Sequence, residues 1–294
     1  MTALAQIDRL MHAGYYAGSL PLRHWIRARL SAQRRMPIIV LFYHRIADDG
    51  AKIGTHSNRL FCNQIRWLQR HCDLISLEEA QRRLRNGFND RLAACITFDD
   101  GYSENCDQAI PFLIDQQIPC TYFVSSWHVL TGRRFAHDVA ADCFALPNTL
   151  EQLRWMALAG IEIGAHARTH ADLGRITDDS KLCDEVVGAG EELQGAIGRP
   201  IRYFAFPFGM PQNLNARAFQ IANEFGYEAV CSAYGDYNFP GDDAFHIRRI
   251  HADDMLQLKN WATINPRRLR TAYSFNYSLP DETKSAIPIA ETAI

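Results

Sequence analysis

The most informative run of residues is Leu92-Ala93-Ala94-Cys95-Ile96-Thr97-Phe98-Asp99-Asp100-Gly101. Its apolar first half is typical of a buried strand, and two adjacent carboxylates follow. Unpaired charge is costly in an apolar interior, so a metal ion or a proton-transfer role would explain the pair. Because successive strand residues point to opposite faces, both carboxylates can face one site only if the strand ends at Phe98 and the chain turns at Gly101. The alternative is an exposed Asp-Asp-Gly turn.

Strand and helix patterns alternate from residue 36 onward. Repeated strand–helix units predict a parallel sheet with covered faces, and seven or eight units predict a closed α/β barrel with its active site at the C-terminal ends of the strands. The predicted strands are 38–43, 72–76, 92–98, 119–124, 161–165, 202–206, 227–231 and 245–250. The predicted helices are 60–70, 78–86, 105–117, 149–159, 178–197, 213–225 and 253–262.

Three segments are expected along the 294 residues. Residues 1–35 mix apolar and basic side chains and predict an N-terminal helical extension, with Pro21 near the start of its second helix. This extension either caps the barrel, the interpretation that we favour, or makes a peripheral contact with an anionic membrane surface. Residues 36–270 are expected to form the barrel domain, and residues 271–294, where the apolar period fades, a flexible tail.

Composition and charge narrow the functional classes. The net charge of -2 gives no reason to expect a nucleic-acid partner. The eight cysteines include no Cys-x-x-Cys pair, so we expect reduced thiols instead of a disulfide framework. Asp8 and Arg9 interrupt any signal-peptide core, and no run approaches the ~20 apolar residues of a membrane span. The expected location is cytoplasmic, with the inner membrane surface as an alternative.

A second polar segment, His166-Ala167-Arg168-Thr169-His170, follows another apolar run. Two histidines four positions apart share one face of a helical turn and can bind one ion. With one carboxylate of the Asp-Asp pair they make a divalent metal site with room for water, and the other carboxylate is left to act as a base. A zinc protease is disfavoured because Ala167 stands where its glutamate would be, and the sequence has no phosphate-binding P-loop.

Aromatic residues also stand at the end of a third predicted strand, in Phe206-Pro207-Phe208. Aromatic walls suit sugar rings, whose C–H faces stack on them. The alternative is plain packing of the barrel.

Together these segments resemble the polysaccharide deacetylase family with the NodB homology domain, carbohydrate esterase family 4, over about residues 36–250. The family motif T-F-D-D-G is matched by residues 97–101 without change. The motif H-[ST]-x-x-H is matched at both histidines, with Ala167 in the Ser/Thr position. Tyr43-His44-Arg45-Ile46 is similar to the Y-H-R-[IV] segment of a branch that includes deacetylases of exopolysaccharide and biofilm clusters.

The resemblance implies a distorted (β/α)7-type barrel that removes acetyl groups from sugars. It implies that Asp99 is the catalytic base and that Asp100, His166 and His170 hold one divalent metal. Zinc is the first expectation, with cobalt, nickel or manganese as alternatives. The metal would lower the pKa of its water toward ~7 and polarise the acetyl carbonyl. The backbone N–H of Tyr102 is expected to hold the oxyanion, and the expected substrate contacts are Tyr102, Phe206, Pro207 and Phe208.

The sequence departs from the family pattern at two places. Ala205 replaces the arginine that often pairs with the base, so Arg248 or Arg249 is a candidate for orienting it. The general acid is expected to be His251, although the match to the family's L-x-H motif is poor. His44, or no histidine at all, is the alternative.

These observations predict a metal-dependent hydrolase that removes acetyl groups, chiefly N-acetyl, from a sugar or glycan precursor. An O-acetyl esterase is the closer alternative, and a non-catalytic carbohydrate-binding barrel is the more distant one. A cytoplasmic location favours a nucleotide sugar, a small N-acetyl glycoside or a lipid-linked precursor as substrate.

Overall fold

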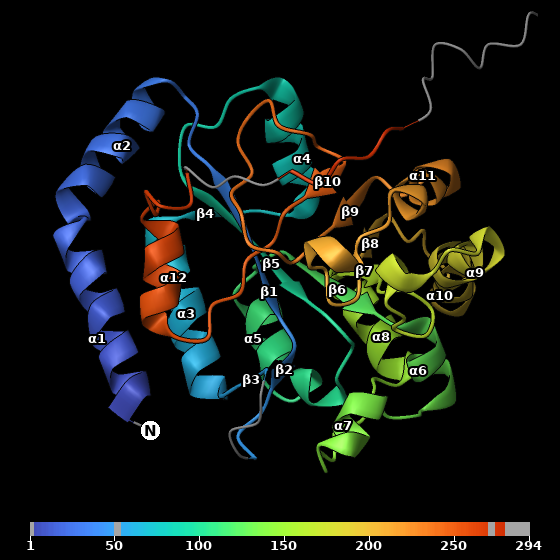
Figure 1. Ribbon diagram of the computed structural model, residues 1–294. Helices are drawn as coiled ribbons and strands as arrows, with labels where there is room; N and C mark the ends of the chain where they lie inside the picture. Colours follow the sequence, from blue (N-terminus) through green and yellow to red (C-terminus); the bar gives the residue numbers. More distant parts are fainter. Residues whose placement is uncertain (1–2, 50–53, 270–273, 280–294) are drawn as a thin grey trace, which may run out of the picture.

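The structure is a computed structural model that describes residues 3–49, 54–269 and 274–279, with side chains described from Leu10 onward. Figure 1 shows a central curved sheet with helices outside it and a pair of helices along one side. The strands are β1 (Ile38–Tyr43), β2 (Arg45–Ile46), β3 (Thr55–His56), β4 (Asp73–Leu74), β5 (Ala93–Phe98), β6 (Cys120–Val124), β7 (Glu162–Ala165), β8 (Tyr203–Ala205), β9 (Ala229–Cys231) and β10 (His246–Ile247).

The main sheet has the order β1-β5-β6-β7-β8-β9-β10, and β4 pairs with the start of β5. All of these pairings are parallel. A parallel bridge between Leu41 and Ile250 brings the chain beyond β10 back to β1. The result is a nearly closed barrel of seven parallel strands, which confirms the predicted distorted (β/α)7 architecture. All eight predicted strands are present, several of them shorter than expected.

Helices cover the outside of the barrel. Each predicted helical range corresponds to one helix, except 178–197, which is divided into three helical elements. The pattern missed the small β2–β3 sheet and the short helices α6 and α7. The helical elements are α1 (Ala3–Gly18), α2 (Leu20–Ala32), α3 (Asn58–His71), α4 (Leu77–Asn86), η1 (Ser103–Cys106), α5 (Ala109–Asp115), α6 (Ser126–Thr131), α7 (Ala136–Ala140), α8 (Leu150–Leu158), η2 (Leu173–Arg175), α9 (Asp179–Cys183), η3 (Asp184–Gly188), α10 (Ala189–Ile197), η4 (Pro211–Asn213), α11 (Ala216–Phe225) and α12 (Met255–Ala262).

Strand alternation sorts the core into two layers. On β5, Ala94 and Ile96 face the helices, whereas Ala93 and Cys95 belong to the cluster inside the barrel. The inner cluster combines small residues with large ones such as Phe123 and Tyr203, all of them buried, so the interior is filled. The same alternation sends Asp99, one step beyond the strand, toward the barrel axis.

The N-terminal helices α1 and α2 lie beside α12 and α3 (Figure 1). Arg23 of α2 is buried and donates to the Asn260 carbonyl at 2.9 Å and to the Asn260 side chain at 2.7 Å. No helix of the described residues is long and apolar enough to cross a membrane. All eight cysteines are described and unpaired, as predicted.

Part of the segment expected to be a tail packs on the barrel. The rings of Phe275 and Tyr277 stack on Phe219 of α11, with centroids 5.4 and 4.1 Å away. Of the predicted tail, residues 271–273 and 280–294 lie outside the described residues.

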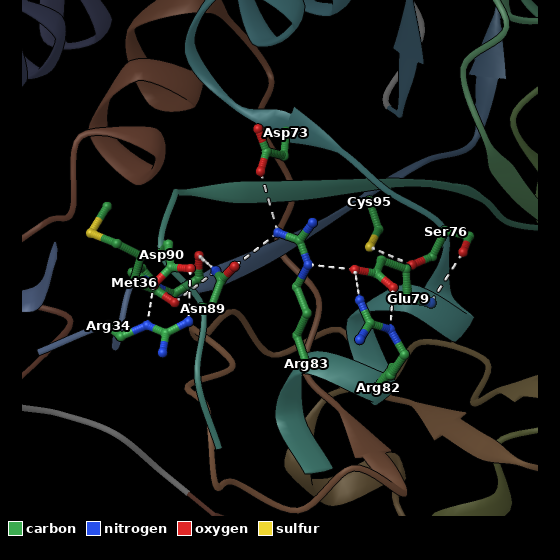
Figure 2. A network of polar contacts seen from close by, with 11 residues as sticks. Arg34, Met36, Asp73, Ser76, Glu79, Arg82, Arg83, Asn89, Asp90 and Cys95 are labelled. Atoms are coloured by element: carbon green, nitrogen blue, oxygen red, sulfur yellow. Dashed lines mark hydrogen bonds and ion pairs between the residues drawn. The ribbon is translucent and has the colours of Figure 1, made fainter. Parts of the chain in front are cut away.

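At the N-terminal end of the barrel, a network of charged and polar side chains connects α4 to the strands (Figure 2). Arg83 of α4 donates to Glu79 at 2.7 Å, to Asn89 at 2.8 Å and to Asp73 of β4 at 3.3 Å. Asn89 in turn donates to the Met36 carbonyl at 2.9 Å, just before β1. This network ties α4 to the strands at the end of the barrel that carries no predicted site residue.

Candidate active site

Asp99 is held by a buried arginine. Arg249 is 0% exposed and donates to the two carboxylate oxygens of Asp99 at 2.6 and 2.8 Å. It also donates to the Ser232 carbonyl at 3.0 Å and to Thr97 Oγ1 at 3.2 Å, which fixes the guanidinium. Burial pushes the pKa of Asp99 upward, but Arg249 outweighs this effect and keeps the pKa below its ordinary value.

This contact decides between the two arginines that the sequence left open. Arg249 pairs with Asp99, whereas Arg248 bonds to Asp242 instead. The guanidinium that holds Asp99 therefore belongs to Arg249. Arg249 comes from the chain just beyond β10, and position 205, where the resemblance led us to look for an arginine, is Ala205.

The chain turns sharply after Asp99, as the sequence predicted. Asp100 has φ +70° and Gly101 has φ +86°, and the Gly101 N–H donates to the Asp99 carbonyl at 2.8 Å. A Cβ on Gly101 would lie 2.7 Å from Val124 Cγ1, so glycine is required both by its conformation and by the space. The turn brings the Asp100 carboxylate to the same site as Asp99.

Asp100, His166 and His170 form a group that could hold a metal. Their ligand atoms all lie within 4.8 Å of one another, and Asp100 Oδ1 is 3.5 Å from His166 Nε2 and 3.2 Å from His170 Nε2. His166 Nδ1 lies 2.8 Å from the Ala205 carbonyl, which orients the ring and leaves Nε2 free as a ligand. Burial lowers the pKa of His166 to about 4, so the ring is neutral, as a ligand must be.

The residues present fit a divalent cation. Among the described residues, Asp100 Oδ1 is buried and has no hydrogen-bond partner, although it faces two ring nitrogens. A buried carboxylate oxygen without a hydrogen bond is costly. Two imidazole nitrogens and one carboxylate oxygen are a ligand set that zinc and related ions accept, with positions left for water.

Backbone strain gathers around this group. Of the described residues other than glycine, Asp100, Ala167, His170 and Phe208 are four of the eight with positive φ. The turn at Phe208 repeats the turn at Asp100: the Gly209 N–H donates to the Pro207 carbonyl at 2.6 Å, and a Cβ on Gly209 would lie 2.7 Å from Ala233 N. Such strain persists where the surrounding structure enforces it, typically at functional sites.

A pocket of about 630 Å³ opens over these residues, which is within the range of about 300–1,000 Å³ for small-molecule sites. Phe208 is 55% exposed there, and its ring centroid lies 5.0 Å from that of His170. The pocket brings together most of the predicted site residues. Its lining includes Phe42, His44, Arg45, Asp99, Asp100, Tyr102, His137, Asp138, Cys143, His166, His170 and Phe208.

Three predicted residues lie elsewhere. Phe206 is buried, and its ring stacks on Phe219 at 5.0 Å. Neither Phe206 nor Pro207 is among the residues that line the pocket. His251 is also outside the lining, with Nδ1 3.1 Å from Asp253 and its ring 5.2 Å from that of His56. Burial lowers the pKa of His251 to about 4.

His44, the alternative to His251, lies in the pocket wall beside the two carboxylates. The ring centroids of His44 and His251 are 6.1 Å apart, so the two histidines are close, but only His44 reaches the cavity. The structure thus places His44, and not His251, in the pocket wall, a difference that the sequence alone could not show.

The sequence analysis did not identify the part of the pocket wall that α7 provides. His137 and Asp138 come from the five-residue helix α7, which is too short to show a periodic pattern. The hydroxyl of Tyr102 donates to Asp138 Oδ2 at 2.9 Å and lies 3.1 Å from His137 Nε2. Tyr102 thus joins the loop after β5 to α7, and its ring forms part of the lining.

A family model for polysaccharide deacetylase matches residues 86–230, which include the whole Asp-Asp turn and both histidines. Residues 86–230 therefore form a domain of the polysaccharide deacetylase family. YxkH, a candidate polysaccharide deacetylase of Bacillus subtilis (strain 168), is 24% identical over 206 residues. The aligned region is 69% of this chain and 66% of YxkH, slightly less than two-thirds of that relative.

Solved deacetylase structures share the fold. IcaB from Ammonifex degensii gives a TM-score of 0.64 at 22% identity, covering 78% of this chain and 97% of IcaB. The Streptococcus pyogenes deacetylase PplD, in complex with acetate, gives 0.65 at 21% identity, covering 79% of this chain and 99% of PplD. The BpsB deacetylase domain from Bordetella bronchiseptica gives 0.58 at 19% identity, covering 74% and 96%.

Proposed function

We propose that this polysaccharide deacetylase family member is a divalent-metal-dependent hydrolase that removes N-acetyl groups from an acetylated sugar or glycan. The observation that carries the proposal is the arrangement around the Asp-Asp turn. One carboxylate, Asp99, is paired with Arg249 and the other, Asp100, faces two histidine nitrogens without a hydrogen bond. The two neighbours are therefore prepared for different tasks.

In this proposal Asp100, His166 and His170 hold the metal. The bound ion supplies a water of lowered pKa and polarises the acetyl carbonyl. Zinc is the first choice, and cobalt, nickel and manganese are accepted by the same ligand types. The contact of His166 with the Ala205 carbonyl supports this role because it fixes the ring before any ligand arrives.

Asp99 is the proposed general base. It is 3% exposed and, through the guanidinium of Arg249, is fixed in orientation and kept ionised. A carboxylate in that state accepts a proton from water as the water attacks the acetyl carbon. Among the described residues the backbone N–H of Tyr102 has no acceptor, which suits it to donate to the oxyanion that forms.

His44 is the proposed general acid in preference to His251. It lines the pocket with both carboxylates, whereas His251 does not. A protonated imidazole at this position would give its proton to the departing amine. Phe208, exposed at the mouth of the pocket, is the proposed stacking surface for the sugar ring. The acetate in the similar PplD structure is the product that such a reaction would release.

Release of acetate from a panel of N-acetylated and O-acetylated sugars tests this proposal. We expect the N-acetyl substrates to be cleaved, a chelator to stop the reaction and added zinc or cobalt to restore it. Cleavage of O-acetyl substrates alone would replace the proposal with an esterase. Full activity of metal-free protein, or binding of sugars without any turnover, would contradict it.

A further inference from the structure

A second cavity, of about 320 Å³, lies between α2, α3 and α12 and shares no lining residue with the active-site pocket. Its lining is rich in cationic side chains, and the described residues contribute no carboxylate to it. Aromatic and small polar residues complete the wall. The lining residues are Tyr16, Leu20, Arg23, His24, Arg27, Trp67, His71, Lys259 and Thr263.

Arg23 carries a buried charge, and no described carboxylate pairs with it. It is 2% exposed, and its guanidinium donates only to neutral groups: Ser19 Oγ, Thr263 Oγ1 and the backbone and side-chain oxygens of Asn260. The rings of Tyr15 and Tyr16 lie 5.5 and 5.2 Å from it. Burial of a guanidinium without an anion is costly, so a negative charge in the adjoining cavity would be stabilising.

The network at the N-terminal end of the barrel shows the contrast. There Arg34, Arg82 and Arg83 each contact a carboxylate, at 2.6, 2.6 and 2.7 Å (Figure 2). A cavity of about 280 Å³ at that end is lined by three acidic residues, Asp73, Glu79 and Asp90, as well as by arginines. The clustered arginines at the N-terminal end of the barrel therefore have carboxylate partners. The cavity beside Arg23 differs because no described carboxylate lines it.

We propose that the cavity between α2, α3 and α12 binds a phosphate group, carried either by a soluble phosphate ester or by a lipid head group. Arg27 and Lys259 line the cavity, and no salt bridge joins either of them to a described carboxylate. His24 and His71 each direct Nδ1 to a backbone carbonyl, at 2.8 and 2.7 Å, which leaves Nε2 for a ligand. Guanidinium and ammonium groups bind phosphate through charge-assisted hydrogen bonds.

The experiment compares the full-length parent protein with an Arg27→Ala/Lys259→Ala variant and a matched control, Arg29→Ala. Arg29 is exposed on the opposite face of α2, since two positions rotate a helical side chain by about 200°. Calorimetric titration with inorganic phosphate at fixed ionic strength measures the shared chemistry. Sedimentation with phosphatidylcholine vesicles, with and without phosphatidic acid, measures the lipid source.

We expect the double variant to weaken phosphate binding about tenfold or more, with Arg29→Ala within about twofold of the parent. Sedimentation that depends on phosphatidic acid and on Arg27 and Lys259 would identify a lipid head group. Phosphate binding without vesicle binding would identify a soluble ester. The proposal is overturned if the parent binds neither probe, or if Arg29→Ala loses as much binding as the double variant. These readouts do not depend on deacetylase activity.

Discussion

The two ends of the barrel use arginine differently. At the N-terminal end, Arg83 is 21% exposed and shares Glu79 and Asp73 with other arginines, in contact with solvent. At the C-terminal end, Arg249 is fully buried and serves one carboxylate, Asp99, through two hydrogen bonds. Partly exposed networks add modest stability and tolerate change. A buried pair makes each partner depend on the other, and in the proposed mechanism it also orients the general base.

The largest effect is expected at the buried pair. Arg249→Met leaves the Asp99 carboxylate without its partner in the barrel interior. We expect the free energy of unfolding to fall by about 3–5 kcal/mol, together with loss of deacetylation. Arg248→Met is the matched control, because Arg248 is 12% exposed and pairs with Asp242 outside the barrel axis. Chemical denaturation of both variants measures the difference, and equal losses would show that the burial of Arg249 has no special role.

The next effect separates the two histidines. His44→Ala should lower kcat about 10²-fold or more, because a general acid contributes about 10²–10⁴. His251→Ala should change kcat much less, since His251 lies outside the pocket lining. Steady-state kinetics on one N-acetylated substrate, with metal content measured in parallel, tests this order. The reverse order would return the acid role to His251.

A smaller effect is expected at the turn that presents the two carboxylates. Gly101→Ala forces a Cβ to within 2.7 Å of Val124 Cγ1 at φ +86°. Strain of this type costs about 1–3 kcal/mol, and relief of the strain should move Asp100 away from the histidines. Gly87→Ala, at a helix end with φ +75° and open space, controls for conformation alone. If both variants keep the parent's metal content, the turn does not position the site.

The smallest effect belongs to the exposed network. Hydrogen bonds from Arg82 and Arg83 lower the pKa of Glu79 to about 2. A carboxylate with a depressed folded-state pKa stabilises the protein above its unfolded pKa, about 4.3, and loses that contribution as pH falls toward 2. Glu79→Gln should therefore cost less than about 1 kcal/mol at pH 7 and flatten the stability profile below pH 4. Activity should not change, and a loss of activity would connect the two ends of the barrel.

The sequence was sufficient for the barrel and for the turn that brings both aspartates to one site. Apolar runs ending in polar residues predicted β5 and β7, and Gly101 predicted the turn. The sequence could not show which of Arg248 and Arg249 contacts Asp99, because β10 has only two residues and gives no clear alternation of side chains. It could not exclude Phe206 from the pocket, because an outward-facing strand aromatic and a sugar-binding one look alike. His137 and Asp138 lie in a helix of five residues without a period.

The central claim is that two neighbouring aspartates do different work, and Asp99→Asn tests it most directly. The change keeps the shape of the side chain and removes the proton acceptor. We predict that kcat falls by about 10²–10⁴ while bound metal stays near the parent level, because Asp100, His166 and His170 are untouched. Loss of metal from the Asp99→Asn protein would show that the two aspartates share or exchange roles. Full activity with full metal content would show that Asp99 is only a turn residue.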